Sequence, residues 1–201
     1  MCEYLENIKT DTKFVILMHP KEFKKVKNNT GAFTHRTLSN SELFVGIDFS
    51  DHRRVNEIIA THDGYVLFPS KNSINLSEVN PKKSEKSLAI FIIDSTWACT
   101  KKIFTQSKNL HALKHMSFTT TKASQYQIKE QPHSDYLSTI ESALVVLELL
   151  NKWGLEEISE TKLDAFLNPF LKMIEYQQEI INKRLPNSLR CKELHGIMSL
   201  N

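Results

Sequence analysis

The residues Asp94-Ser95-Thr96-Trp97 stand between an apolar run over residues 88–93 and a segment with the spacing of a helix. An acid at the carboxyl end of a buried parallel strand faces the crevice in which open α/β sheets bind ligands. The start of the following helix adds backbone N–H groups that attract anions. Asp94 is therefore a candidate general base. Capping of the helix by Asp94 or Thr96 explains the same residues equally well, so both interpretations stay open.

Short apolar runs recur along the chain and predict the strands that would position this junction. They cover residues 14–18, 43–47, 65–68, 88–93 and, more briefly, 116–118. The segments between them are long enough to hold helices. The alternation predicts an α/β fold with a mostly parallel sheet flanked by helices on both faces.

Helical spacing is clearest over residues 137–152, where apolar residues follow the i, i+3, i+4, i+7 pattern and Gly154 marks the end. Ser138-Thr139-Ile140-Glu141 at the start forms a capping box, which explains Glu141 without a further function. Weaker patterns predict helices over 53–61 and 96–107. A last helix over 160–184 contains Pro169, which should interrupt or kink it.

The 201 residues suit a single domain, and the three cysteines are too scattered for a disulfide framework or a zinc site. We therefore expect a cytoplasmic protein without a metal. No apolar run reaches membrane-spanning length, and the start of the chain lacks the pattern of a signal peptide. We accordingly expect no membrane association.

The formal net charge is only +3, but the positive residues are unevenly distributed. Lysines crowd one short segment after the first predicted strand, and other basic residues could extend the same surface. These residues are Lys21, Lys24, Lys25, Arg36, Arg53, Arg54 and Lys101. They either form a surface for a polyanion or are simply solvated.

Several blocks resemble, in order, the DTW-domain family of tRNA-uridine aminocarboxypropyltransferases. The signature of that family is an acid, any residue, threonine and tryptophan after a buried strand, as in Asp94-Ser95-Thr96-Trp97. The other blocks are His19-Pro20-Lys21-Glu22, Asn29-Thr30-Gly31, Leu67-Phe68-Pro69-Ser70, Tyr126-Gln127-Ile128-Lys129 with Pro132, and Leu137-Ser138-Thr139-Ile140-Glu141. The resemblance spans roughly residues 13 to 180 and is far more specific than one tetrapeptide.

The sequence departs from the family pattern at a few positions. Ser95, Lys129 and Ser142 replace the more usual glycine, arginine and alanine. Many relatives also carry an N-terminal cysteine-rich, zinc-knuckle-like stretch, where only Cys2 stands here. We therefore divide the chain into an N-terminal remnant or extension (1–12), a catalytic domain (13–185) and a loosely held tail (186–201).

The resemblance implies a fold like that of the SPOUT methyltransferases, with a knotted C-terminal region that binds S-adenosylmethionine. The implied reaction transfers the 3-amino-3-carboxypropyl group of this cofactor to N3 of a tRNA uridine and leaves methylthioadenosine. Uridine N3 must lose a proton first, and Asp94 is the expected base. Thr96 and Trp97 complete the catalytic motif. Trp97 either stacks on the base, shapes the cofactor pocket or packs in the core.

For the cofactor, the resemblance implies that adenosine lies against Leu67, Phe68, Pro69 and Ser70 and the backbone of Ile128 and Lys129. Its carboxylate would bind at the start of the 137–152 helix, near Leu137, Ser138 and Thr139. Glu141 would then either bind the cofactor's amino group or close the helix.

For the RNA, we expect His19 at an exposed strand end, where it either contacts phosphate or forms a turn. Asn29 and Thr30, with Gly31, are expected in a tight turn facing the RNA. Lys21, Lys24, Lys25, Arg36 and Lys101 would add positive charge. Two alternatives remain, a SPOUT-type RNA methyltransferase and a non-catalytic RNA-binding module. The sequence leaves open which tRNA and uridine are used and whether the protein is a monomer or a homodimer.

Overall fold

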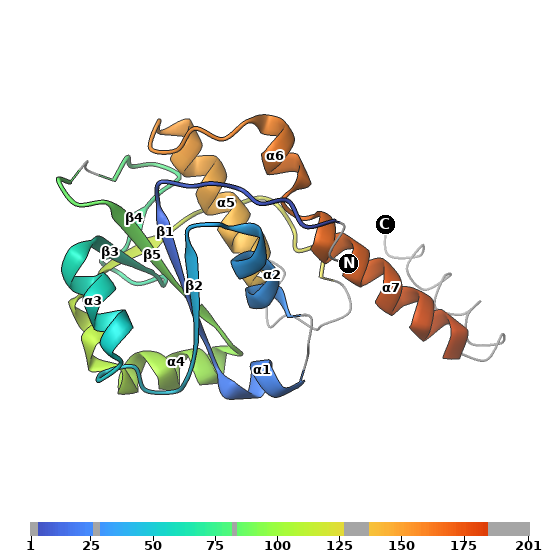
Figure 1. Cartoon of the computed structure of the whole chain (residues 1–201), viewed down its shortest axis with the longest axis horizontal. Helices are drawn as coiled ribbons and strands as arrows, with labels where there is room; N and C mark the ends of the chain where they lie inside the picture. The colour runs from blue at the N-terminus through green and yellow to red at the C-terminus, as the bar shows by residue number, and fades with distance from the viewer. Residues whose placement is uncertain (1–3, 26–28, 82–83, 127–136, 185–201) are drawn as a thin grey trace.

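A parallel sheet forms the centre of the molecule in the computed structural model, which describes residues 4–25, 29–81, 84–126 and 137–184 (Figure 1). Its strands lie in the order β2-β1-β5-β3-β6-β4, and every neighbouring pair is parallel. Their bounds are β1 Lys13–Met18, β2 Ser41–Val45, β3 Asp63–Leu67, β4 Ile74–Asn75, β5 Leu88–Asp94 and β6 Lys114–Ser117. The predicted α/β fold with a parallel sheet is confirmed.

Helices cover both faces of this sheet. Their bounds are α1 Pro20–Lys25, α2 Thr30–Thr37, α3 Arg53–Thr61, α4 Trp97–Gln106, the 3₁₀ helix η2 Lys108–Ala112, α5 Thr139–Lys152, α6 Glu160–Ala165 and α7 Asn168–Arg184. Phe14 and Ile16 of β1 pack in the core beneath α2, α5 and α7, whereas Val15 and Leu17 face α3 and α4. Because both faces of β1 are buried, its sequence is a continuous apolar run.

The helices predicted from spacing are found with small shifts at their ends. The structure gives α3 the predicted bounds, 53–61. Gly154 ends α5 with a φ of 68°, and Leu155 N–H donates to Leu150 O at 2.9 Å, as in a Schellman motif. The predicted last helix is divided into α6 and α7, and Pro169 lies in the first turn of α7, where its missing N–H costs little.

Two elements in the N-terminal half of the chain differ from the predictions made from the sequence. Residues 29–31 do not form a tight turn, because Asn29 is the N-cap of α2 and its Oδ1 accepts from Ala32 N–H at 2.7 Å. Asn favours both turns and helix caps, so the residue type alone did not separate them. The two-residue strand β4 was also missed, since it is too short to show alternation.

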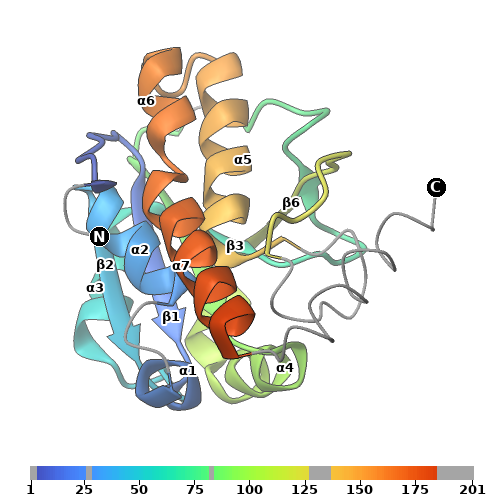
Figure 2. The same cartoon turned by 90° about the vertical axis from the view of Figure 1, so that its right-hand side faces the viewer.

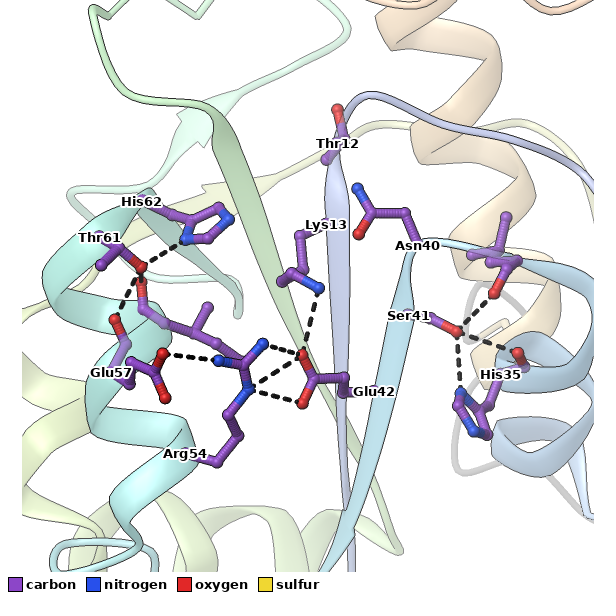
Figure 3. A network of polar contacts seen from close by, with 12 residues as sticks. Thr12, Lys13, His35, Asn40, Ser41, Glu42, Arg54, Glu57, Thr61 and His62 are labelled. Carbon is purple, nitrogen blue, oxygen red and sulfur yellow. Dashed lines mark hydrogen bonds and ion pairs between the residues drawn. The ribbon is translucent and has the colours of Figure 1, made fainter.

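A polar network joins the edge strand β2 to its neighbours (Figure 3). Glu42 of β2 accepts hydrogen bonds from Lys13 Nζ at 3.2 Å and from Arg54 Nη2 of α3 at 2.7 Å. Arg54 also pairs with Glu57 at 2.8 Å. Arg54 therefore connects α3 to the sheet through these ion pairs. Its charge is neutralised by Glu42 and Glu57, whereas the sequence had suggested that Arg54 extends a positive surface for a polyanion.

The segment before β1 is packed into the same domain. Ile8 is fully buried, and its N–H donates to Thr37 O at 2.8 Å. Further along, the Glu156 carboxylate accepts from the N–H groups of Asp11 and Thr12 at 3.0 and 2.6 Å. These bonds fix the segment to α2 on one side and to the chain after α5 on the other.

None of the helices in the described part of the chain has the length and apolar character needed to span a membrane.

Candidate active site

Asp94 is the last residue of β5, at the carboxyl edge of the sheet, and only 7% of it is exposed. Alternation along β5 places it on the same face as Ile90 and Ile92, which pack beneath α5. Thr139 Oγ1, in the first turn of α5, donates to Asp94 Oδ1 at 2.5 Å. The structure thus brings together two predicted site residues that are 45 positions apart.

Gly31 of α2 packs against the other carboxylate oxygen of Asp94. A Cβ added at Gly31 would lie 2.4 Å from Asp94 Oδ2 and 2.8 Å from its Cγ. Because no side chain fits between them, the helix backbone itself forms this wall of the site. Sequence reasoning placed Gly31 in a tight turn and missed its contact with Asp94. The family-like block Asn29-Thr30-Gly31 was the signal that could have found it.

The N-cap residue of α4 is Thr96 and not Asp94. Thr96 occupies the N-cap position of α4, and its exposed side chain makes no capping hydrogen bond to the described residues. Ser95 Oγ instead lies 2.7 Å from Thr100 Oγ1. Trp97 begins α4, and the structure describes its backbone alone, so its predicted role stays a prediction. The structure therefore gives the N-cap position to Thr96, as one of the two interpretations predicted, but without a capping hydrogen bond from its side chain.

His19 lies beside Asp94 but is not exposed as predicted. Its N–H donates to Asp94 O at 3.1 Å, which joins the ends of β1 and β5, and only 5% of the residue is exposed. Its Nδ1 accepts from Lys21 N–H at 3.1 Å. Burial, and then the charge of Lys21, lowers the pKa of His19 below 6.5. The predicted exposed position at the strand end is therefore wrong, because His19 is packed into the interior beside Asp94.

This burial predicts a pH dependence of stability. Burial also lowers the pKa values of His35 and His62, so below pH 6.5 the unfolded state binds more protons than the folded state. The free energy of unfolding should fall as pH drops from about 6.5 toward about 5. The lowered pKa of Glu42 acts only below its ordinary value of 4.5 and does not affect this window. Urea unfolding at about pH 7.5, 6.5 and 5.5 measures the effect.

The His62→Gln variant is the control for that measurement. It removes one of the titrating rings and should flatten the dependence between about pH 6.5 and 5.5. An equally steep fall in the variant would contradict a contribution from His62, and a free energy of unfolding that is constant over this range would contradict the whole account.

Glu141 joins the start of α5 to the segment that precedes it. Its buried carboxylate accepts from Ser138 N–H at 2.8 Å, as the predicted capping box requires. The same carboxylate accepts from Ser138 Oγ at 2.6 Å. It also accepts from Ser124 Oγ at 2.9 Å and Gln125 N–H at 2.7 Å. In this structure Glu141 therefore closes the helix and holds residues 124–125, a second function that the capping box did not predict.

Tyr126 follows that held segment and is a further site residue that sequence reasoning did not assign. Its ring packs edge-on against Phe170 at 5.4 Å between centroids. Burial raises the pKa of its hydroxyl, and the carboxylates of Glu22 and Asp94 raise it further. The charges of these two acids therefore act on the Tyr126 hydroxyl and favour its protonated form. Its place in a family-like block was the signal that could have found it.

The loop Leu67-Phe68-Pro69-Ser70 is divided between the two faces of the sheet. Leu67 packs against the core beneath α5, whereas the Phe68 ring stacks on Phe104 of α4 at 4.8 Å. Phe68 N–H donates to Met116 O at 3.0 Å, and Ser70 Oγ lies 2.8 Å from His115 Nδ1. The loop backbone lies at the same edge as Asp94, but the Phe68 side chain points to the opposite face.

The remaining predicted residues are distributed around this edge. Lys21, Lys24, Arg36 and Lys101 are exposed, Thr30 is buried in the first turn of α2, and Leu137 is partly buried before α5. The structure describes the backbone alone at Lys25. The predictions for Ile128 and Lys129 lie outside the described residues. Among the described residues, no three acidic, histidine or cysteine side chains form a metal site.

These features define a class of protein, an α/β domain with a parallel sheet and a buried acid at its carboxyl edge, between the first turns of two helices. The DTW-domain model matches residues 1–178, and the chain belongs to the DTW-domain family. The resemblance read from the sequence blocks is thereby confirmed.

Curated relatives carry the name tRNA-uridine aminocarboxypropyltransferase 2. The protein from Drosophila melanogaster is 31% identical over 144 residues, covering 69% of this chain and 56% of the relative. The protein from Mus musculus is 29% identical over 157 residues, covering 76% of this chain and 53% of the relative. The chain thus spans about half the length of the curated relatives it matches. No solved structure matches it.

Proposed function

We propose that this chain transfers the 3-amino-3-carboxypropyl group of S-adenosylmethionine to N3 of a uridine in tRNA. Membership of the DTW-domain family and the names of the curated relatives support this reaction. The observation that carries it is the buried Asp94 carboxylate, held by Thr139 at the carboxyl edge of the sheet. A carboxylate within hydrogen-bond reach of uridine N3 can take the proton that prevents this nitrogen from acting as a nucleophile.

The residues at this edge fit the proposed cofactor. The first turn of α5 presents backbone N–H groups suited to a carboxylate, and the backbone of the loop 67–70 can read adenine. Ser138 and Glu141 would hold the start of α5 in place, because their side chains are hydrogen-bonded to each other. When bound, S-adenosylmethionine supplies the sulfonium from which the transferred group leaves. The protein then has to hold uridine N3 in line with the reacting carbon.

We also propose the SPOUT-like knot. The strand before α5 is β6, which pairs with β3 (Figure 2), yet Thr139 at the start of α5 bonds to Asp94 at the end of β5. A knot requires that the chain between β6 and α5 pass through the connection from β3 to β5, and residues 127–136 of that chain lie outside the described residues. Cytoplasmic location, the absence of a metal, and a monomeric or homodimeric state stay predictions.

Product analysis tests the proposed reaction. Purified protein is incubated with S-adenosylmethionine and unmodified tRNA, and the RNA is digested to nucleosides for mass spectrometry. We expect a uridine carrying the aminocarboxypropyl group. A methylated nucleoside would favour the RNA methyltransferase, and RNA binding without any product would favour the non-catalytic binding module.

The exposed lysines of α1 give a separate prediction about the RNA. Replacing Lys21 and Lys24 with alanine should weaken tRNA binding and reduce the dependence of log K on log salt by about 0.7 to 0.9 for each phosphate that is no longer neutralised. Cofactor binding should not change. Lys162→Ala on α6, at the other end of the molecule, is the matched control (Figure 1). Equal RNA affinity and salt dependence in the α1 variant would exclude these lysines from the interface.

A further inference from the structure

Phe23 is the exposed aromatic residue of α1, with 59% of its surface accessible. Other phenylalanines in the described core, such as Phe33, Phe91 and Phe170, are at most 1% exposed. One exposed apolar residue is common on protein surfaces and does not by itself indicate a site. Its position relative to Asp94 and to the lysines supplies the independent observations.

The helix that carries Phe23 is fixed to the candidate base. His19 N–H donates to Asp94 O at 3.1 Å, and the N–H groups of Glu22 and Phe23 donate to His19 O at 2.9 and 3.3 Å. At about 1.5 Å rise per residue, Phe23 lies about 6 Å along the helix from His19. Asn29 Nδ2 also donates to Glu22 O at 3.4 Å, which connects the first turn of α1 to the N-cap of α2. Phe23 is thus held on the outer rim of the site.

Lysines lie near Phe23 in the sequence of α1, which also contains the acid Glu22. Lys21 and Lys24 of α1 are exposed on either side of Phe23 in the sequence. The charges of Lys21, Glu22 and Lys102 all act on His19, just before this helix. A polyanion with planar rings, such as unpaired RNA, complements an exposed aromatic side chain among lysines, because phosphates pair with the ammonium groups and bases stack on the ring.

We propose that Phe23 stacks on the unpaired base next to the target uridine. This inference rests on the proposed function. N3 lies on the edge that uridine uses for base pairing, so the target has to leave its pair and its stack before it reaches Asp94. Its neighbour loses a stacking partner at the same time. Phe23 replaces that partner on the outer rim, whereas Asp94, only 7% exposed, contacts the flipped base within the site.

Binding measurements on three variants test the stacking role. Stacking of one base is worth about 1–3 kcal/mol, so Phe23→Ala should raise the Kd for tRNA about 5- to 150-fold. Phe23→Trp should bind at least as tightly as the parent. Phe23→Leu should lose nearly as much affinity for tRNA as the alanine variant. Leucine keeps the apolar surface, but it lacks the flat ring on which a base stacks. Val79→Ala, at another exposed apolar residue, should bind like the parent.

Two results would overturn the inference. One is a Phe23→Ala variant whose Kd stays within about twofold of the parent, and the other is a Phe23→Leu variant that binds as well as the parent. Thermal unfolding of each variant checks that it is folded. The product assay is run beside the binding assay, so the two proposals fail separately. A parent protein that forms no product contradicts the proposed function, whereas product formation with unchanged binding by Phe23→Ala contradicts the stacking role alone.

Discussion

Replacing Asp94 with asparagine is expected to lower the rate of transfer by about 10²- to 10⁴-fold, the usual contribution of a general base. Asparagine has nearly the same shape, and its Oδ1 can accept the hydrogen bond that Thr139 Oγ1 gives to Asp94. It cannot take the N3 proton. The variant should therefore bind tRNA and S-adenosylmethionine as the parent does, while the rate of transfer in a single-turnover experiment falls by the stated factor.

Asp63→Asn provides a matched control for this experiment. Asp63 begins β3 at the opposite edge of the sheet, where its carboxylate pairs with Lys114 at 2.7 Å. Removal of this ion pair should leave the rate of transfer unchanged. An Asp94→Asn variant with the parent rate would remove Asp94 as the base. A variant that fails to bind tRNA or cofactor would instead show that Asp94 binds a ligand and does not act as a base.

The Gly31→Ala variant should lose activity by about 100-fold through a single added methyl group, since a displacement of about 1 Å at a reacting group can cost that much. The new Cβ would lie 2.4 Å from Asp94 Oδ2 and 3.0 Å from Met18 Cε, so the carboxylate has to move. Thr139 holds the same carboxylate on its other side. Steady-state kinetics should show the loss in kcat.

The free energy of unfolding of the Gly31→Ala variant distinguishes a local displacement of Asp94 from a general loss of folding. Alanine is the better helix former by about 1 kcal/mol, which offsets part of the cost of overpacking at position 31. Gly154→Ala is the opposite case, because Gly154 has a φ of 68° and no atoms within 4 Å of an added Cβ. It should lower stability by about 1 kcal/mol and leave activity intact. Parent-like kcat in Gly31→Ala would show that the site can accommodate the displaced carboxylate.

The parts of the fold that could be predicted are those with dense local patterns. The strands β1 and β5 are continuous apolar runs because the sheet is buried on both faces, and α3 shows clear helical spacing. The two-residue β4 and the short helix α1 contain too few residues to show a period. Their positions depend on tertiary contacts, which local patterns do not encode.

The same distinction applies to the candidate site. Asp94 could be placed at a strand end, and the Ser138–Glu141 capping box could be recognised, because each depends on neighbouring residues. The contacts of Asp94 with Gly31 and Thr139 join segments that are far apart in the chain. The sequence blocks indicated that these segments matter without showing that one carboxylate joins them.

The contacts of the first residues determine where the folding unit begins. Ile8 fills a core position, and the N–H groups of Asp11 and Thr12 donate to the buried Glu156 carboxylate. A chain that begins at residue 13 would leave a cavity where Ile8 packs. It would also leave the buried Glu156 carboxylate without these two donors, and both changes lower the free energy of unfolding. The smallest fragment that keeps this packing therefore starts before Ile8, within the part of the sequence that a motif-based boundary would discard.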